Sequence, residues 1–60
     1  MNTRIKEIRM KKGLTQKELS EQSNLSERQI IRIENNKSNP TLCTLDRIAK
    51  ALNKTVDEIF

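Results

Sequence analysis

The chain has 60 residues, a net charge of +4, one cysteine and no histidine, so we expect one small domain over residues 1–60 and exclude an internal disulfide and a zinc site of Cys and His ligands. A single aromatic residue argues against stacking on single-stranded bases. The sequence contains no long apolar run and no apolar N-terminal segment, which excludes a membrane helix and a secretory signal and predicts a cytoplasmic protein.

The positive charge is concentrated in the N-terminal part of the chain. Residues 1–37 contain nine basic and five acidic side chains, whereas residues 38–60 contain three of each. A basic sector of this kind is typical of proteins that bind a phosphate backbone, although many small soluble domains are also basic.

The first helix is expected over about residues 3–12. Ile5 and Ile8 are three residues apart and would share its buried face. Gly13 follows two lysines, and glycine is the usual residue just past a helix end because it accepts a left-handed backbone. The helix should therefore end at this glycine.

A second helix is expected over residues 16–22, because Thr15 and Glu18 form a capping box. In that arrangement the threonine hydroxyl accepts from the backbone amide of the glutamate, and the glutamate side chain accepts from the backbone amide of the threonine. Leu14 precedes the cap and can pack on Leu19.

Ser26 and Gln29 repeat this arrangement and predict a third helix over residues 27–34. Asn24 lies between the two helices, and asparagine tolerates the left-handed backbone that a sharp turn requires. Two helices joined by so short a turn cannot lie in line, so this region predicts helix-turn-helix geometry.

The C-terminal part predicts a loop over residues 35–40 and then two more helices. Thr41 would cap the fourth helix, which should end at Asn53. Thr55 and Glu58 form a third capping box and predict a short fifth helix. The expected fold is all-α, with five helices around one core and no strand. The fourth helix carries the clearest apolar stripe, formed by Leu42, Leu45, Ile48, Ala49 and Leu52, with Cys43 beside it as a small apolar filler.

Three motifs occur in order along the chain: G-L-T-Q-x-E-L at residues 13–19, I-x-x-I-E-N at 30–35 and N-P-T-L-x-T-L-x-x-I-A-x-A-L at 39–52. With them, residues 4–60 resemble the lambda-repressor-like helix-turn-helix domains, also called the Xre family. Asn24 stands where many members have glycine, and Ser20 where many have alanine.

The resemblance implies a compact five-helix bundle that binds double-stranded DNA with its third helix in the major groove. It implies a transcriptional regulator, and we expect a repressor that acts as a homodimer on a palindromic operator. No enzyme activity, cofactor, metal or small-molecule ligand is expected. The alternative is a protein-interaction module, such as an antitoxin that binds a toxin, which would present an apolar groove instead of a basic one.

The site residues follow from the family and from their chemistry. Arg28 and Arg32 are one helical turn apart, and an arginine fork can pair with O6 and N7 of guanine. The same two side chains could instead form ordinary solvated ion pairs. Residues expected to read bases are Glu27, Arg28, Gln29 and Arg32, and those expected along the DNA backbone are Gln16, Lys17, Ser26, Asn35, Lys37, Ser38 and Thr41.

Two further groups are expected to be structural. In similar domains an arginine of the first helix pairs with a glutamate near the end of the third, which here implies a pair between Arg9 and Glu34. Val56, Ile59 and Phe60 are mainly core residues, and any exposed part of them is the candidate dimer patch.

Overall fold

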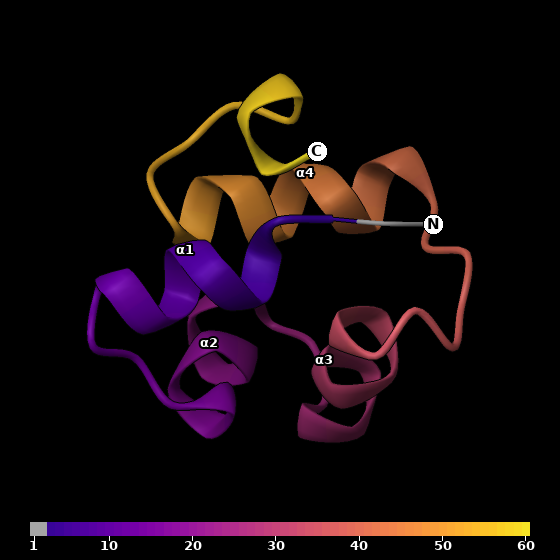
Figure 1. Ribbon diagram of the computed structural model, residues 1–60. Helices are drawn as coiled ribbons and strands as arrows, with labels where there is room; N and C mark the ends of the chain where they lie inside the picture. Colours follow the sequence, from indigo (N-terminus) through magenta and orange to yellow (C-terminus); the bar gives the residue numbers. More distant parts are fainter. Residues whose placement is uncertain (1–2) are drawn as a thin grey trace.

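The computed structural model describes residues 3–60, and in that range it contains helices and no strand. The elements in chain order are α1 (Ile5–Lys11), α2 (Gln16–Ser23), α3 (Glu27–Glu34), α4 (Leu42–Ala51) and one turn of 3-10 helix, η1 (Asp57–Ile59) (Figure 1). No helix in the described range is long and apolar enough to cross a membrane.

The two predicted capping boxes of the helix-turn-helix are confirmed. At α2, the Thr15 hydroxyl accepts from the Glu18 amide at 3.0 Å, and the Glu18 carboxylate accepts from the Thr15 amide at 2.9 Å. At α3, Ser26 and Gln29 make the same reciprocal pair at 3.2 and 3.0 Å. Asn24 lies between them with a φ of 59°, the left-handed conformation that ends α2 and turns the chain.

The other helix ends also follow local signals. Gly13 has a φ of 71° and lies just past α1, which begins at Ile5, two residues later than predicted. Thr41 caps α4 by accepting from the Thr44 amide at 3.2 Å. Asn53 follows α4 with a φ of 59°. The loops therefore begin where residues that tolerate a left-handed backbone stand.

The predicted fifth α-helix is wrong, because the chain forms only η1 there. The Thr55 amide and hydroxyl both donate to Glu58 Oε1, at 2.9 and 3.1 Å, so the hydroxyl does not cap a backbone amide. The Glu58 and Ile59 amides bond to carbonyls three residues back, at 3.1 and 3.2 Å. Nucleating an α-helix is unfavourable, and so short a segment forms too few further hydrogen bonds to offset that cost. One turn of 3-10 helix forms instead.

The core is one cluster of apolar side chains contributed by every element. Helix α2 packs against both α3 and α4, and the hydroxyls of the buried Ser20 and Ser23 bond to carbonyls of α2 itself. The Arg4 amide donates to the Ile59 carbonyl at 2.6 Å and joins the start of α1 to η1, which Figure 1 shows at the C-terminal end. The buried members are Ile5, Ile8, Leu19, Ile30, Ile33, Leu45, Ile48, Ala49, Leu52 and Ile59.

Leu42, a predicted member of the α4 stripe, and Cys43, predicted beside the stripe, both lie outside this core. Leu42 is 70% exposed, and Cys43 is also exposed, so neither is a core filler. Both stand in the first turn of α4, and the buried residues of this helix begin at Leu45. Helical periodicity assigns a residue to a face, but it does not tell how far along the helix that face is covered.

Candidate nucleic-acid interface

The orientation of α3 is set by its two buried isoleucines. Ile30 is 0% exposed and Ile33 is 4% exposed, and both belong to the core cluster. Because side chains three residues apart share a face, burying this pair turns the opposite face of α3 to solvent. The exposed side chains include all four that were predicted to read bases, which are Glu27, Arg28, Gln29 and Arg32.

The first turn of α3 exposes two charged side chains, Glu27 and Arg28. Neither Glu27 nor Arg28 forms a hydrogen bond or an ion pair with the residues that the structure describes. Gln29 differs, because its Oε1 accepts from both the amide and the hydroxyl of Ser26, at 3.0 and 3.2 Å. The side-chain amide nitrogen of Gln29 remains available as a donor. A single turn thus offers an acidic acceptor, a guanidinium fork and an amide donor.

Arg32, one turn further along α3, is held by the following loop. Its Nη2 donates to the Lys37 carbonyl at 3.1 Å, and the Lys37 amide donates to the Arg32 carbonyl at 2.8 Å. Asn36 has a left-handed φ of 58°, which turns the chain so that Lys37 lies back against Arg32. The two arginines of the predicted reading face therefore differ, because Arg28 is free and Arg32 is joined to the loop.

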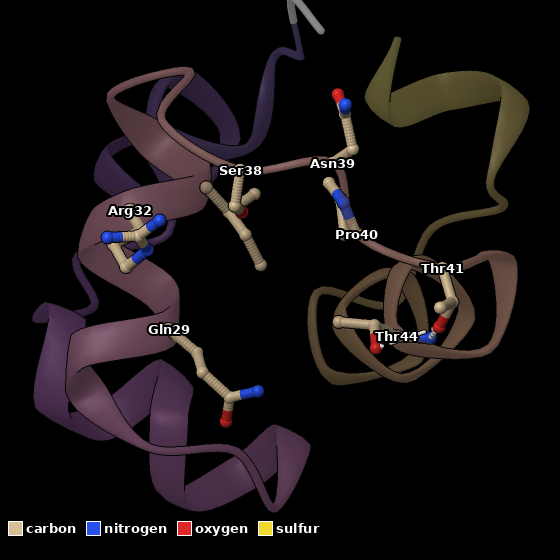
Figure 2. A pocket seen from close by; sticks show the side chains of 8 residues that line it. Gln29, Arg32, Ser38, Asn39, Pro40, Thr41 and Thr44 are labelled. Carbon is tan, nitrogen blue, oxygen red and sulfur yellow. Dashed lines mark hydrogen bonds between the residues drawn. The ribbon is translucent and has the colours of Figure 1, made fainter.

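A cleft of about 310 Å³ separates the exposed side of α3 from the start of α4. In Figure 2, Gln29 extends from α3 towards the side where Thr41 and Thr44 lie. More of the lining surface of the cleft is apolar than polar, because Ile33 and Pro40 contribute to it. Its hydroxyl, amide and guanidinium groups offer donors that suit phosphate oxygens. Its lining residues are Gln29, Arg32, Ile33, Ser38, Asn39, Pro40, Thr41 and Thr44.

Three cleft residues belong to the third sequence motif but were not predicted as site residues: Asn39, Pro40 and Thr44. The sequence did contain a signal for Thr44. A capping side chain accepts from the backbone amide three residues later, and Thr44 stands three residues after the cap Thr41. Its hydroxyl lies 3.1 Å from the Thr41 hydroxyl. The loop position of Asn39 gave no comparable signal.

The residues predicted along the DNA backbone lie in two places. Lys17, at the start of α2, and Ser26, at the cap of α3, are exposed, and Gln16 is half-buried. The loop after α3 carries the exposed Asn35, Lys37 and Thr41 and the half-buried Ser38.

Arg9 and Glu34 form an ion pair between α1 and the end of α3. Arg9 Nε donates to Glu34 Oε2 at 2.7 Å and Nη2 donates to Oε1 at 3.3 Å. Only 10% of the arginine side chain and 1% of the glutamate side chain is exposed. Arg9 Nη1 also donates to the Leu14 carbonyl at 2.6 Å, and Gln16 Nε2 donates to Glu34 Oε1 at 3.0 Å. The pair therefore belongs to a network that joins α1, α2 and α3.

The candidate dimer patch is smaller than predicted. Ile59 is 0% exposed, which confirms its prediction as a core residue, so it contributes no exposed part to the patch. Val56 is half-buried, while Phe60 is 46% exposed. The sequence did not indicate that Met10, at the end of α1, is 60% exposed. Within the described range, no group of three or more acidic, Cys or His side chains could hold a metal ion.

Comparisons with known proteins agree with this geometry. The helix-turn-helix family model matches residues 5–59. An uncharacterized HTH-type transcriptional regulator of Archaeoglobus fulgidus is 37% identical over 60 residues, which cover the whole of this chain and 86% of the relative. The immunity repressor protein of Bacillus phage phi105 is 45% identical over 56 residues, which cover 93% of this chain and 39% of the repressor.

A solved structure has the same fold. The restriction-modification controller protein C.AhdI from Aeromonas hydrophila superimposes with a TM-score of 0.92 at 32% sequence identity, over 95% of this chain and 86% of the controller protein.

Proposed function

Because the chain belongs to the lambda-repressor-like helix-turn-helix family, whose members are DNA-binding transcriptional regulators, we propose that it represses transcription by binding a specific duplex sequence. The observation that carries this proposal is the exposed first turn of α3, where Glu27 and Arg28 have no partner among the described residues. Unpaired charged side chains on a rigid helix are suited to direct contact with base edges.

In the proposed complex α3 lies in the major groove with its N-terminal turn against the bases. Arg28 pairs with O6 and N7 of a guanine, a contact worth ~1–3 kcal/mol of discrimination. Glu27 accepts from a cytosine amino group, and the free amide nitrogen of Gln29 donates to a base acceptor. Arg32 uses one of its five N–H groups on the Lys37 carbonyl and contacts a base through the others.

The DNA backbone is held on both sides of α3. One stretch of the DNA backbone is contacted at the start of the helix-turn-helix, by Lys17, Gln16 and Ser26. A second stretch, along the loop after α3 and the cleft, is contacted by Asn35, Lys37, Ser38 and Thr41. These contacts fix register and affinity without reading sequence. The exposed Arg28 and Arg32 on α3 support DNA over a protein-interaction module, which would present an apolar groove instead of a basic face.

We further propose that two copies bind a palindromic operator. One recognition helix covers too few base pairs for selectivity, and a two-fold dimer doubles the readout. The half-sites would lie ~10–10.5 base pairs apart, one turn of DNA. The exposed parts of Phe60 and Val56 are the candidate contact between the copies. Occupying the operator then blocks transcription with no chemical step.

Selection of bound sequences from a random duplex library at about 0.15 M salt tests the proposal, because screening weakens nonspecific attraction there. Enrichment of an inverted repeat with half-sites one turn apart is expected. The variant Arg28→Ala should flatten the preference at one position of each half-site. The control Lys37→Ala should weaken binding to all sequences alike. Recovery of no motif by a folded protein would overturn the proposal.

A further inference from the structure

Glu34 of α3 bonds to residues of both α1 and α2, although its side chain is almost completely buried. Its two carboxylate oxygens accept from Arg9 of α1 at 2.7 and 3.3 Å, and Oε1 also accepts from Gln16 Nε2 of α2 at 3.0 Å. Only 1% of its side chain is exposed. A side chain so covered does not itself touch DNA, and any effect it has on binding must pass through a neighbour.

We propose that Glu34 is a positioning residue that holds the Gln16 side chain in place to contact a DNA phosphate. This inference rests on the proposed function and on the assignment of Gln16 to the DNA backbone. The amide nitrogen of Gln16 carries two hydrogens, and the bond to Glu34 uses one of them. The second hydrogen is left as the donor for a phosphate oxygen.

Position and flexibility explain why Gln16 benefits from such a partner. It is the first residue of α2, where a helix turns unpaired backbone amides towards solvent and favours an anion. A free glutamine loses side-chain conformational entropy when a ligand orders it. A side chain already ordered by Glu34 loses less on binding, and this preorganisation raises affinity.

Arg9 makes a carboxylate acceptable so close to the DNA backbone. An unpaired carboxylate beside a phosphate would repel it, because like charges interact strongly where water is excluded. The Arg9 guanidinium cancels that charge through two hydrogen bonds to Glu34. Arg9 also donates to the Leu14 carbonyl at 2.6 Å, which fixes the turn that leads into α2. The carboxylate can therefore orient Gln16 without presenting net negative charge to DNA.

A double-mutant cycle tests the proposal with Gln16→Ala, Glu34→Asp and the double variant. Aspartate keeps the charge that Arg9 needs but is one methylene shorter. Binding to a mixed-sequence duplex at about 0.05 M salt is followed by fluorescence anisotropy, since a phosphate contact forms on any sequence. We expect Gln16→Ala to weaken binding ~10-fold, the loss of one hydrogen bond to a charged group. Glu34→Asp should weaken the parent several-fold and the Gln16→Ala protein by less than twofold.

The dependence on salt separates this role from that of a charged contact. Neither Gln16→Ala nor Glu34→Asp removes a positive charge, so the slope of log affinity against log salt should not change. The control Lys37→Ala should lower that slope by ~0.9. Equal losses from Glu34→Asp in both backgrounds would overturn the proposal and leave Glu34 a purely structural residue. No binding by the folded parent to this duplex or to selected duplexes would instead overturn the proposed function.

If Glu34→Asp unfolds, the parent protein itself supplies the test. The two side-chain amide hydrogens of Gln16 give separate NMR signals. We expect the hydrogen bonded to Glu34 to exchange slowly with water before DNA is added, and the other to shift when the mixed-sequence duplex binds. Equal, fast exchange of the two hydrogens, or no shift on binding, would overturn the proposal.

Discussion

Arg9→Ala should be among the most damaging single substitutions in this domain. It removes both hydrogen bonds to Glu34 and the bond to the Leu14 carbonyl. The Glu34 carboxylate, whose side chain is 1% exposed, is then left with the Gln16 amide as its remaining partner. Breaking a buried ion pair by removing one member costs ~3–5 kcal/mol, because the other charge stays buried without compensation.

That cost is large compared with the total stability of a domain of this size. A chain of 60 residues is expected to unfold with a free energy of only ~3–9 kcal/mol. Since 1 kcal/mol moves the melting temperature by ~4–8 °C in a small domain, Arg9→Ala should lower it by at least ~12 °C. Urea and thermal unfolding followed by circular dichroism, at fixed protein concentration, measure both quantities.

Arg4→Ala is the matched control, because Arg4 pairs with Glu7 at 3.5 Å while 55% and 52% of the two side chains are exposed. An exposed pair contributes only ~0–1 kcal/mol. Replacing both members of the buried pair, with Arg9→Met and Glu34→Leu, should recover much of the lost stability, since no charge is then buried alone. An Arg9→Ala protein no less stable than Arg4→Ala would refute the reasoning.

Three other outcomes are expected. Thr15→Ala removes the hydroxyl of the α2 cap and should cost ~1 kcal/mol in urea unfolding, and an unchanged midpoint would contradict this role. Ile59→Ala should cost ~2–5 kcal/mol, because this side chain is 0% exposed, whereas Phe60→Ala, at a residue 46% exposed, should cost far less in the same assay. Hydrogen bonds from Thr55, mainly from its backbone amide and secondly from its hydroxyl, hold the pKa of Glu58 below its ordinary value of 4.5. The stability that these bonds contribute is therefore present above pH 4.5 and is lost as the pH falls through the lowered pKa. NMR titration should show this lowered pKa and its partial return in Thr55→Ala.

The helix-turn-helix could be predicted from the sequence because its signals are local. Each capping box lies within four residues, and Asn24 alone supplies the left-handed turn between α2 and α3. The fifth helix failed for a related reason. The pattern of Thr55 and Glu58 indicates where a helical turn begins, but it does not indicate whether the turn continues into an α-helix.

Contacts between elements were harder to predict. The bond from Gln16 to Glu34 joins residues 18 apart in the chain, and its existence depends on how α2 packs on α3. The tie between Arg32 and the Lys37 carbonyl likewise depends on the path of the loop. The pairing of Arg9 with Glu34 was expected from the family resemblance, because neither periodicity nor spacing indicates it. The assignment of particular side chains to DNA stays a prediction.

The central claim is that Arg28 reads a guanine from the major groove. The most direct measurement replaces each selected guanine with 7-deazaguanine, which lacks the N7 acceptor, and compares the affinities of the parent and Arg28→Ala. At one position per half-site the parent should lose ~1 kcal/mol, because the N7 bond is lost while the O6 bond remains. Arg28→Ala should bind the two duplexes equally. Equal losses in the parent and in Arg28→Ala at every position, or no loss in the parent at any position, would contradict the claim.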